Sequence, residues 1–441
     1  MGNWAALSLS IALIIWAGSM RALTGTWLQP ASFFPLWWCF AGILPLVFAP
    51  DEVVGANAMV WLLASSVVVT IGAVVGNGGF RTRRVVEPSP PSPAETRIFV
   101  AALLVATALG IGSNVAFVAA SSISFADVFD LEKLVVASNQ AYFQRYAEVG
   151  APPPPPYSQA LLPFVYFAPA LGGVLFVIGR GFAAKSLSLL SLLPAIAVTV
   201  LQTTKAALLF AFVLWFSCYF ATRLRMGRLA VFTRTHLLAA GALGGIVLVF
   251  FFAVGLARLA STDVSLINVV LLKLVTSAFG HMTVFSQWLA EYTAADFDPT
   301  LGSVTFAGPL ELLGFGIRIP GLFDSIVDLV AGETSNIFTG FRPLIQDFGI
   351  PGALAILGLV GFVGGVGFRG VAAGRWSSVP LLLIAYVTIL WSPITWFWIY
   401  NSLTVSVFGV GVLIILVRIW RGSVAQRGLT RIDPVVDSFS S

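Results

Sequence analysis

The residues best suited to chemistry lie in NIFTGFRPLIQDFGIPG, residues 336–352, where a polar stretch becomes a long apolar run. Pro343 is typical of a first helical turn, so we expect a helix to begin near it and Arg342 to precede it in a loop. A helix start presents free N–H groups and a positive dipole end, which favour an anion. The planar guanidinium of Arg342 matches phosphate oxygens. The segment therefore predicts a phosphate site; the alternative is an arginine that anchors to lipid headgroups.

Lys205 is a second isolated cation, in TVLQTTKAALLF between two apolar runs. We expect the connection between those runs to be only a few residues long and to face outward. A cation held there suits a lipid-linked phosphate. The alternative is a lysine whose ammonium simply reaches up to the headgroups.

Acidic residues offer a weaker signal. Asp127 and Asp130 have helical i, i+3 spacing and Glu132 follows, so they could share a metal or supply a base. A solvated acidic patch is the favoured interpretation, and we predict neither a metal nor a cofactor. Phosphate-loop, dinucleotide-binding, HExxH and Gly-x-Ser-x-Gly motifs do not occur, so nucleotide hydrolysis, hydride transfer and serine hydrolysis lack support.

The composition shows what must hold these residues in place. Hydrophobic residues make up 58% of the chain and charged residues 10%, against roughly 25% charged in soluble domains. Such a chain is predicted to be an all-α integral membrane protein, because only helices satisfy each backbone amide within one span. We predict about 11 spans, with an error of one or two, in apolar runs at 4–20, 32–49, 57–76, 98–120, 160–179, 186–203, 204–221, 235–256, 346–367, 378–397 and 400–419.

Charge asymmetry predicts the orientation. With an outer N-terminus and an inner C-terminus, 17 of the 24 basic residues fall on the inner side and 15 of the 19 acidic residues on the outer side. The net charge of +5 therefore reflects membrane topology, and we expect no nucleic-acid partner. The two cysteines, Cys39 and Cys218, both lie in predicted spans, so neither a disulfide scaffold nor a thiolate metal site is supported.

Two long outer loops divide the spans. We divide the chain into N-terminal spans (1–120), a first outer loop (121–160), central spans (161–256), a second outer loop (257–345), C-terminal spans (346–419) and an inner tail (420–441). The second loop opens with a predicted amphipathic helix lying along the membrane surface, whose polar stripe runs from Lys273 to Glu291 through Thr276, Gly280, Thr283 and Gln287. The alternative is a twelfth span, which the basic-residue asymmetry disfavours.

The segment SNIFTGFRPLIQDFGIPGAL, preceded by TLGSVTFAGPLELLG, resembles bacterial oligosaccharide repeat unit polymerases, the O-antigen polymerase family. That family carries a Gly-Asn-x-Tyr-Thr-x-x-Arg-x-x-x-x-Asp-Phe-Gly pattern before a late span. The chain departs from it at Ser335 and Phe338. TTKAALL resembles the family's Ser-Arg-x-x-Leu-Leu, with Lys205 in place of Arg, which keeps the charge but loses the bidentate geometry.

The resemblance implies a GT-C-like membrane glycosyltransferase of the bacterial inner membrane, with an active site facing the periplasm. Its substrate would be an oligosaccharide repeat unit linked to undecaprenyl diphosphate, and its partners membrane lipid and a chain-length regulator. Arg342 and Lys205 would stabilise the leaving diphosphate. The base would be Glu291 or Asp347, although Asp347 could instead orient Arg342. The expected substrate-binding residues are Asn336, Thr339, Lys273, Arg318 and Arg145.

Two other functions stay open. An O-antigen ligase-like transferase would use the same donor with a different acceptor. A non-enzymatic transporter of lipid-linked oligosaccharides would need no base; carriers usually keep charges or broken helices near the membrane midplane, and charge inside the predicted spans is scarce.

Overall fold

The computed structural model describes the chain apart from residues 1, 81–90, 122–125, 127–129, 147–154, 230–233, 260–265, 293–298, 316–322, 324–325, 330–331, 333 and 430–441. In chain order its elements are α1 (Gly2–Thr24), α2 (Pro30–Phe48), α3 (Ala56–Asn77), α4 (Pro93–Ala120), α5 (Leu131–Tyr146), α6 (Pro156–Ile178), α7 (Gly181–Leu190), α8 (Leu193–Leu201), α9 (Lys205–Arg225), α10 (Arg234–Arg258), α11 (Ile267–Phe279), α12 (His281–Tyr292), α13 (Ala307–Leu312), β1 (Val327–Asp328), β2 (Thr334–Ser335), α14 (Phe341–Ala372), the 3₁₀ turn η3 (Trp376–Ser378), α15 (Val379–Trp391), the 3₁₀ turn η4 (Phe397–Ile399) and α16 (Asn401–Leu429). The two short strands pair antiparallel.

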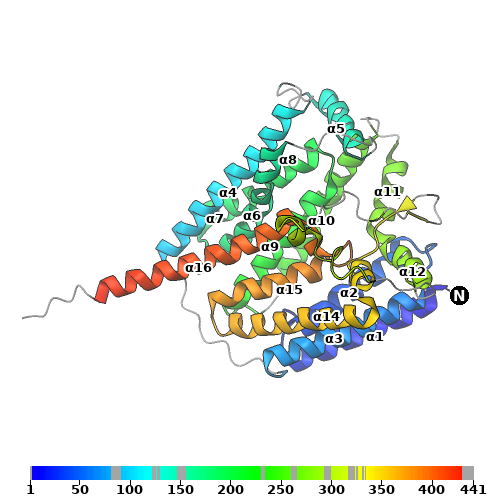
Figure 1. Ribbon diagram of the computed structural model, residues 1–441, viewed down its shortest axis with the longest axis horizontal. Helices are drawn as coiled ribbons and strands as arrows, with labels where there is room; N and C mark the ends of the chain where they lie inside the picture. The colour runs from blue at the N-terminus through cyan, green and yellow to red at the C-terminus, as the bar shows by residue number, and fades with distance from the viewer. Residues whose placement is uncertain are drawn as a thin grey trace, which may run out of the picture.

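The protein is an all-α integral membrane protein, as predicted (Figure 1). Within the described ranges, nine helices are long and apolar enough to span a membrane, and α11 with α12 makes a tenth if the two form one bent span. The runs predicted at 235–256 and 378–397 give shorter apolar helices, over Gly244–Arg258 and Trp376–Trp391. The count therefore lies at the lower edge of the predicted range.

Local sequence explains where several helices begin. α4 starts with a capping box, in which the Ser92 hydroxyl accepts from the Glu95 amide (3.2 Å) and the Ser92 amide donates to the Glu95 carboxylate (2.7 Å). α2, α6, α8 and α15 each carry a proline in their first turn, where no helical N–H partner is lost.

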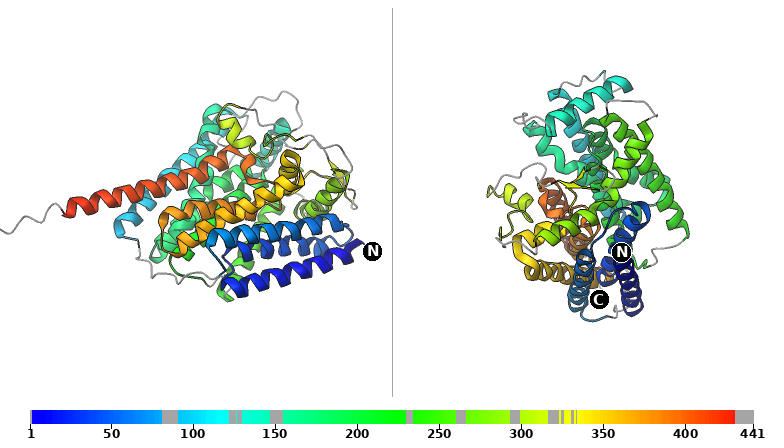
Figure 2. Two further views of the ribbon diagram at one scale, coloured as in Figure 1. Left: turned by 60° about the horizontal axis from the view of Figure 1, so that its bottom comes forward. Right: turned by 90° about the vertical axis from the view of Figure 1, so that its right-hand side faces the viewer.

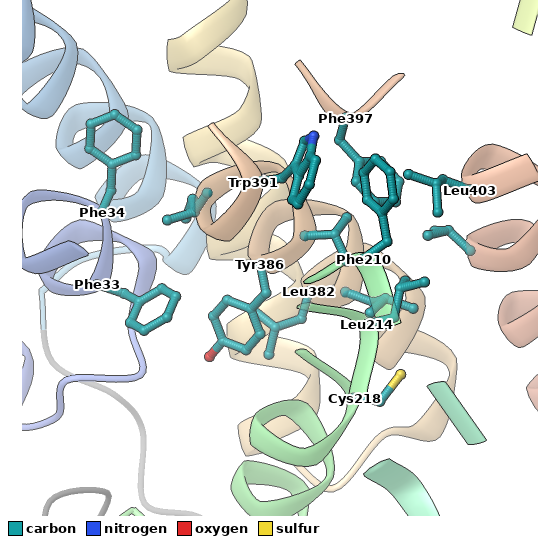
Figure 3. Close-up of a cluster of buried hydrophobic side chains, with 14 of the residues drawn as sticks. Phe33, Phe34, Phe210, Leu214, Cys218, Leu382, Tyr386, Trp391, Phe397 and Leu403 are labelled. Carbon is teal, nitrogen blue, oxygen red and sulfur yellow. The ribbon is translucent and has the colours of Figure 1, made fainter. Parts of the chain in front are cut away.

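Aromatic rings from distant helices form the core of the bundle. Phe33 of α2, Phe210 of α9 and Tyr386 of α15 project into it (Figure 3). The ring centres of Phe210 and Trp391 are 3.9 Å apart, and the Tyr386 hydroxyl donates to the Leu28 carbonyl at 2.5 Å. The rings of Phe33 and Tyr386, 5.2 Å apart, add the contact between α2 and α15.

Glycines let α3 and α14 pack backbone to backbone (Figures 1 and 2). Gly72 and Gly76 are spaced by four on α3, and Gly361 and Gly365 are spaced by four on α14. A Cβ at Gly76 would lie 2.2 Å from the Phe362 carbonyl oxygen, and one at Gly365 would lie 2.2 Å from the Ala73 oxygen. Such small-residue pairs stabilise helix packing in membranes by close van der Waals contact. We call this contact the glycine seam.

We expect Gly365→Leu to destabilise the protein by about 1–3 kcal/mol or more, because the new side chain must push the two helices apart. The thermal midpoint of detergent-solubilised protein, followed by size-exclusion chromatography, measures this. Gly245→Leu is the matched control, since a Cβ at Gly245 meets nothing within 4 Å. Equal midpoints for the two variants would contradict the role of the glycine seam.

The prediction of a single amphipathic helix at the start of the second outer loop is wrong. α11 and α12 meet at Gly280 with a bend of 52°. The predicted polar stripe does not all face solvent either, since Thr276 and Thr283 are buried while Lys273 and Glu291 are exposed. The helical pattern continues through Gly280, so periodicity alone gave no sign of the bend.

Candidate functional site

Lys205 begins α9 directly after a sharp break from α8. Thr203, in the break, has a φ of 46°, a left-handed conformation that is uncommon for a threonine. The Arg258 side chain, at the end of α10, donates to the Thr203 carbonyl through Nε (2.8 Å) and Nη2 (2.5 Å). Arg258 thereby holds the turn that presents Lys205, and the predicted short connection is confirmed.

Three positive charges gather at this point, namely Lys205, Arg258 and Lys273, and we call them the basic cluster. The charges of Arg258 and Lys273 both act on the half-buried Lys205. Like charges held together repel, so a bound anion would lower the energy of this arrangement. Lys205 and Lys273 were predicted site residues. Arg258 was missed, because in the sequence it is only the last residue of an apolar helix.

Arg342 is the second residue of α14, so the prediction that it lies in a loop before the helix is wrong. Its guanidinium carbon lies 3.9 Å from the ring centre of Phe338, 4.0 Å from that of Phe323 and 5.3 Å from that of Trp288. Cation–π contacts of this kind stabilise a partly buried charge and restrict its orientation.

Glu291 accompanies Arg342, and its negative charge acts on the guanidinium. Glu291 lies near the end of α12, where the hydroxyl of the next residue, Tyr292, donates to the Ile345 carbonyl (3.0 Å). This bond fixes the end of α12 against the first turns of α14. Glu291 itself is exposed. Arg342, Glu291 and the three rings form what we call the arginine cluster.

Asp347 has a different setting from the one expected of a base. Its side chain is fully buried. One carboxylate oxygen accepts from the Thr300 hydroxyl and the Val304 amide, and the other accepts from the Thr305 amide. The carboxylate therefore orders the 300–305 turn. Of the two carboxylates predicted from the sequence as the base, Asp347 is buried and Glu291 is exposed.

The other predicted residues divide into three groups. Asn336 is exposed, three residues before Thr339, whose buried hydroxyl accepts from the Phe341 amide at 3.3 Å. Arg318 and Asp127 lie outside the described residues, as does the side chain of Arg145 in α5. Asp130 caps α5 and pairs with Lys133 at 3.6 Å, as expected of a solvated patch. In the part of the chain that the structure describes, no three His, Cys, Asp or Glu residues could hold a metal ion.

Strained backbone marks both clusters. Among the described residues, only Thr203, Leu301 and Thr339 combine a side chain with a positive φ. Thr203 precedes Lys205 by two residues, Thr339 precedes Arg342 by three, and the Leu301 amide donates to the Asp347 carbonyl (3.2 Å). Left-handed non-glycine residues cost free energy and concentrate at binding sites, so this distribution points to function.

The bent pair α11 and α12 links the two clusters. Lys273 on α11 belongs to the basic cluster, and Glu291 on α12 belongs to the arginine cluster. The sequence predicted one site containing both Lys205 and Arg342. The structure instead gives each cation its own set of neighbours.

Comparison with known proteins gave no match to a family model, a curated protein or a solved structure. The resemblance to oligosaccharide repeat unit polymerases therefore stays a prediction, carried by the motif residues.

Proposed function

We propose that this protein is a membrane glycosyltransferase that joins oligosaccharide repeat units carried on polyprenyl diphosphate, on the outer face of the bacterial inner membrane. The observation that carries the proposal is the pair of cations, Lys205 and Arg342, each in the first turn of a membrane helix. Helix starts attract anions, and a lipid-linked diphosphate holds its charge at this depth.

In the proposed reaction an acceptor sugar hydroxyl attacks the anomeric carbon of the donor chain. The bond from that carbon to the diphosphate oxygen breaks, and the polyprenyl diphosphate leaves with the electron pair. Glu291 accepts the hydroxyl proton. Arg342 stabilises the charge that develops on the leaving diphosphate, and its contacts with Phe338 and Phe323 hold the guanidinium ready. No nucleotide or other cofactor takes part.

Two clusters suit a polymerase better than a ligase. A polymerase must bind two lipid-linked diphosphates at once, one on the donor and one on the acceptor. We assign the donor to the arginine cluster and the acceptor to the basic cluster. A ligase-like transferase needs only one polyprenyl diphosphate site.

A transporter remains the second candidate, because one observation favours it. Gly349 of α14 has non-helical backbone angles, so this helix is broken near its start. Broken membrane helices are typical of transporters, whose binding sites they line. The sequence alone did not reveal this break.

The test is to supply purified protein with a lipid-linked repeat unit as its sole sugar substrate and to separate the products by length. A polymerase makes longer lipid-linked chains. A transporter leaves the substrate unchanged, and so does a ligase in the absence of its own acceptor.

We expect polymerisation to continue in the presence of EDTA. The guanidinium of Arg342 would stabilise the leaving diphosphate, and the basic cluster would hold the acceptor's diphosphate, without a metal ion. The measurement is chain length after dialysis against EDTA, with added Mg²⁺ or Mn²⁺ as the control. If EDTA abolished activity and either metal restored it, the prediction would be wrong. The acidic residues Asp127, Asp130 and Glu132 would then be the candidates for a catalytic metal site.

A further inference from the structure

An apolar groove runs along the membrane-spanning part of the protein between α2, α9 and α15. Its volume is about 390 Å³, and all fourteen lining residues are aliphatic or aromatic. The α9 side of the groove runs from Leu209 to Phe220. At 1.5 Å per residue this is about 16 Å along the helix axis, a substantial part of the hydrocarbon thickness.

Lys205 lies on the same stripe of α9 as the groove. The lining residues Leu209, Phe212, Phe216 and Phe220 follow Lys205 at intervals of three or four, the spacing of one helix face. The cation is therefore one turn beyond the end of the groove, on its side of the helix. If a lipid's charged headgroup binds at the basic cluster, its hydrocarbon chain can extend into the groove.

From this arrangement we propose that the groove binds the polyprenyl chain of the lipid whose diphosphate lies at the basic cluster. The inference rests on the proposed function and adds the acceptor's lipid site to it. Three observations select a polyprenyl chain over a phospholipid.

The first is charge: Lys205, Arg258 and Lys273 together suit a diphosphate better than a single phosphodiester. The second is shape, because a single groove takes one chain, whereas a phospholipid carries two. The third is the lining, of which eight residues in fourteen are aromatic. Their flat faces pack well against planar isoprene units and their methyl groups.

The experiment measures binding without turnover. The protein is placed in phosphatidylcholine nanodiscs and titrated with undecaprenyl diphosphate, with complexes counted by native mass spectrometry. Val213→Trp puts a large ring into the groove and should weaken binding about tenfold or more, because several buried methylenes lose their contacts. Leu209→Ala, which removes apolar contact from the groove, should weaken binding in the same direction and covers the case in which the tryptophan variant fails to fold.

Leu416→Trp is the matched control, since Leu416 on α16 is 56% exposed and outside the groove. It should bind as the wild type does. Unchanged affinity in Val213→Trp would overturn the proposal. So would displacement of undecaprenyl diphosphate by an equal concentration of phosphatidic acid, which would make the groove an acyl-chain site.

The outcome separates this inference from the proposed function. If no polymer forms but Val213→Trp still weakens binding, the polymerase proposal fails and the groove assignment stands. If polymer forms and Val213→Trp binds normally, only the groove assignment fails.

Discussion

Arg342→Ala should lower the rate of polymerisation by about 100-fold or more, the usual effect of removing one preorganised donor to a developing negative charge. Arg342→Lys should lose most of the activity as well. The guanidinium carbon of Arg342 lies 3.9 Å from the ring centre of Phe338 and 4.0 Å from that of Phe323. An ammonium has no planar face to set against a ring, and it presents no planar pair of donors to a diphosphate.

The measurement is the rate of chain extension at matched amounts of folded protein in the membrane. Arg369→Ala is the matched control, because it removes an arginine from the last turn of the same helix. Full activity in Arg342→Lys would show that charge alone is sufficient. Full activity in Arg342→Ala would show that the arginine cluster takes no part in the reaction.

Lys205→Ala should also reduce chain extension severely, by about tenfold or more, because the acceptor's diphosphate loses one charge-assisted contact, whereas Lys205→Arg should keep a substantial part of the activity. Within the basic cluster, Lys205 is the cation that lies on the same face of α9 as the residues lining the groove. Arginine at this position keeps the charge and restores the residue usual in the family that the sequence resembles. The readout is the distribution of chain lengths made by each variant.

Lys133→Ala provides the control, since Lys133 is an exposed cation on α5 paired with Asp130. Losing it should leave chain extension unchanged. Polymer of normal length from Lys205→Ala would reduce Lys205 to an anchor in the headgroup region. The assignment of the acceptor to the basic cluster would then be wrong, while the role proposed for Arg342 would stand.

The fold was largely predictable because its signal is local. The apolar runs became helical, although the run at 186–203 is divided between α7 and α8, since hydrocarbon length and backbone hydrogen bonding leave no alternative within a span. The tight turn before Lys205 followed from two apolar runs too close to be joined by anything longer. The bend at Gly280 was not predictable in this way, because the three- and four-residue spacing of α11 continues into α12.

The site was less predictable because it depends on residues far apart in the chain. Arg258 reaches Thr203 across 55 positions, and Asp347 reaches Thr305 across 42. Nothing in the sequence near Asp347 shows that its carboxylate bonds to the 300–305 turn. Likewise, three separate helices line the groove, and no one of them reveals it.

The glycine seam also bears on how the protein is made. α3 enters the membrane early in synthesis, whereas its partner α14 follows only after the central helices and the second outer loop. At roughly 5–20 residues per second the delay is tens of seconds. Until then the backbone of α3 around Gly72 and Gly76 faces lipid or another helix, so the nascent bundle cannot close before translation is nearly complete. Truncated chains that end before α14 should therefore be prime targets for membrane quality-control proteases.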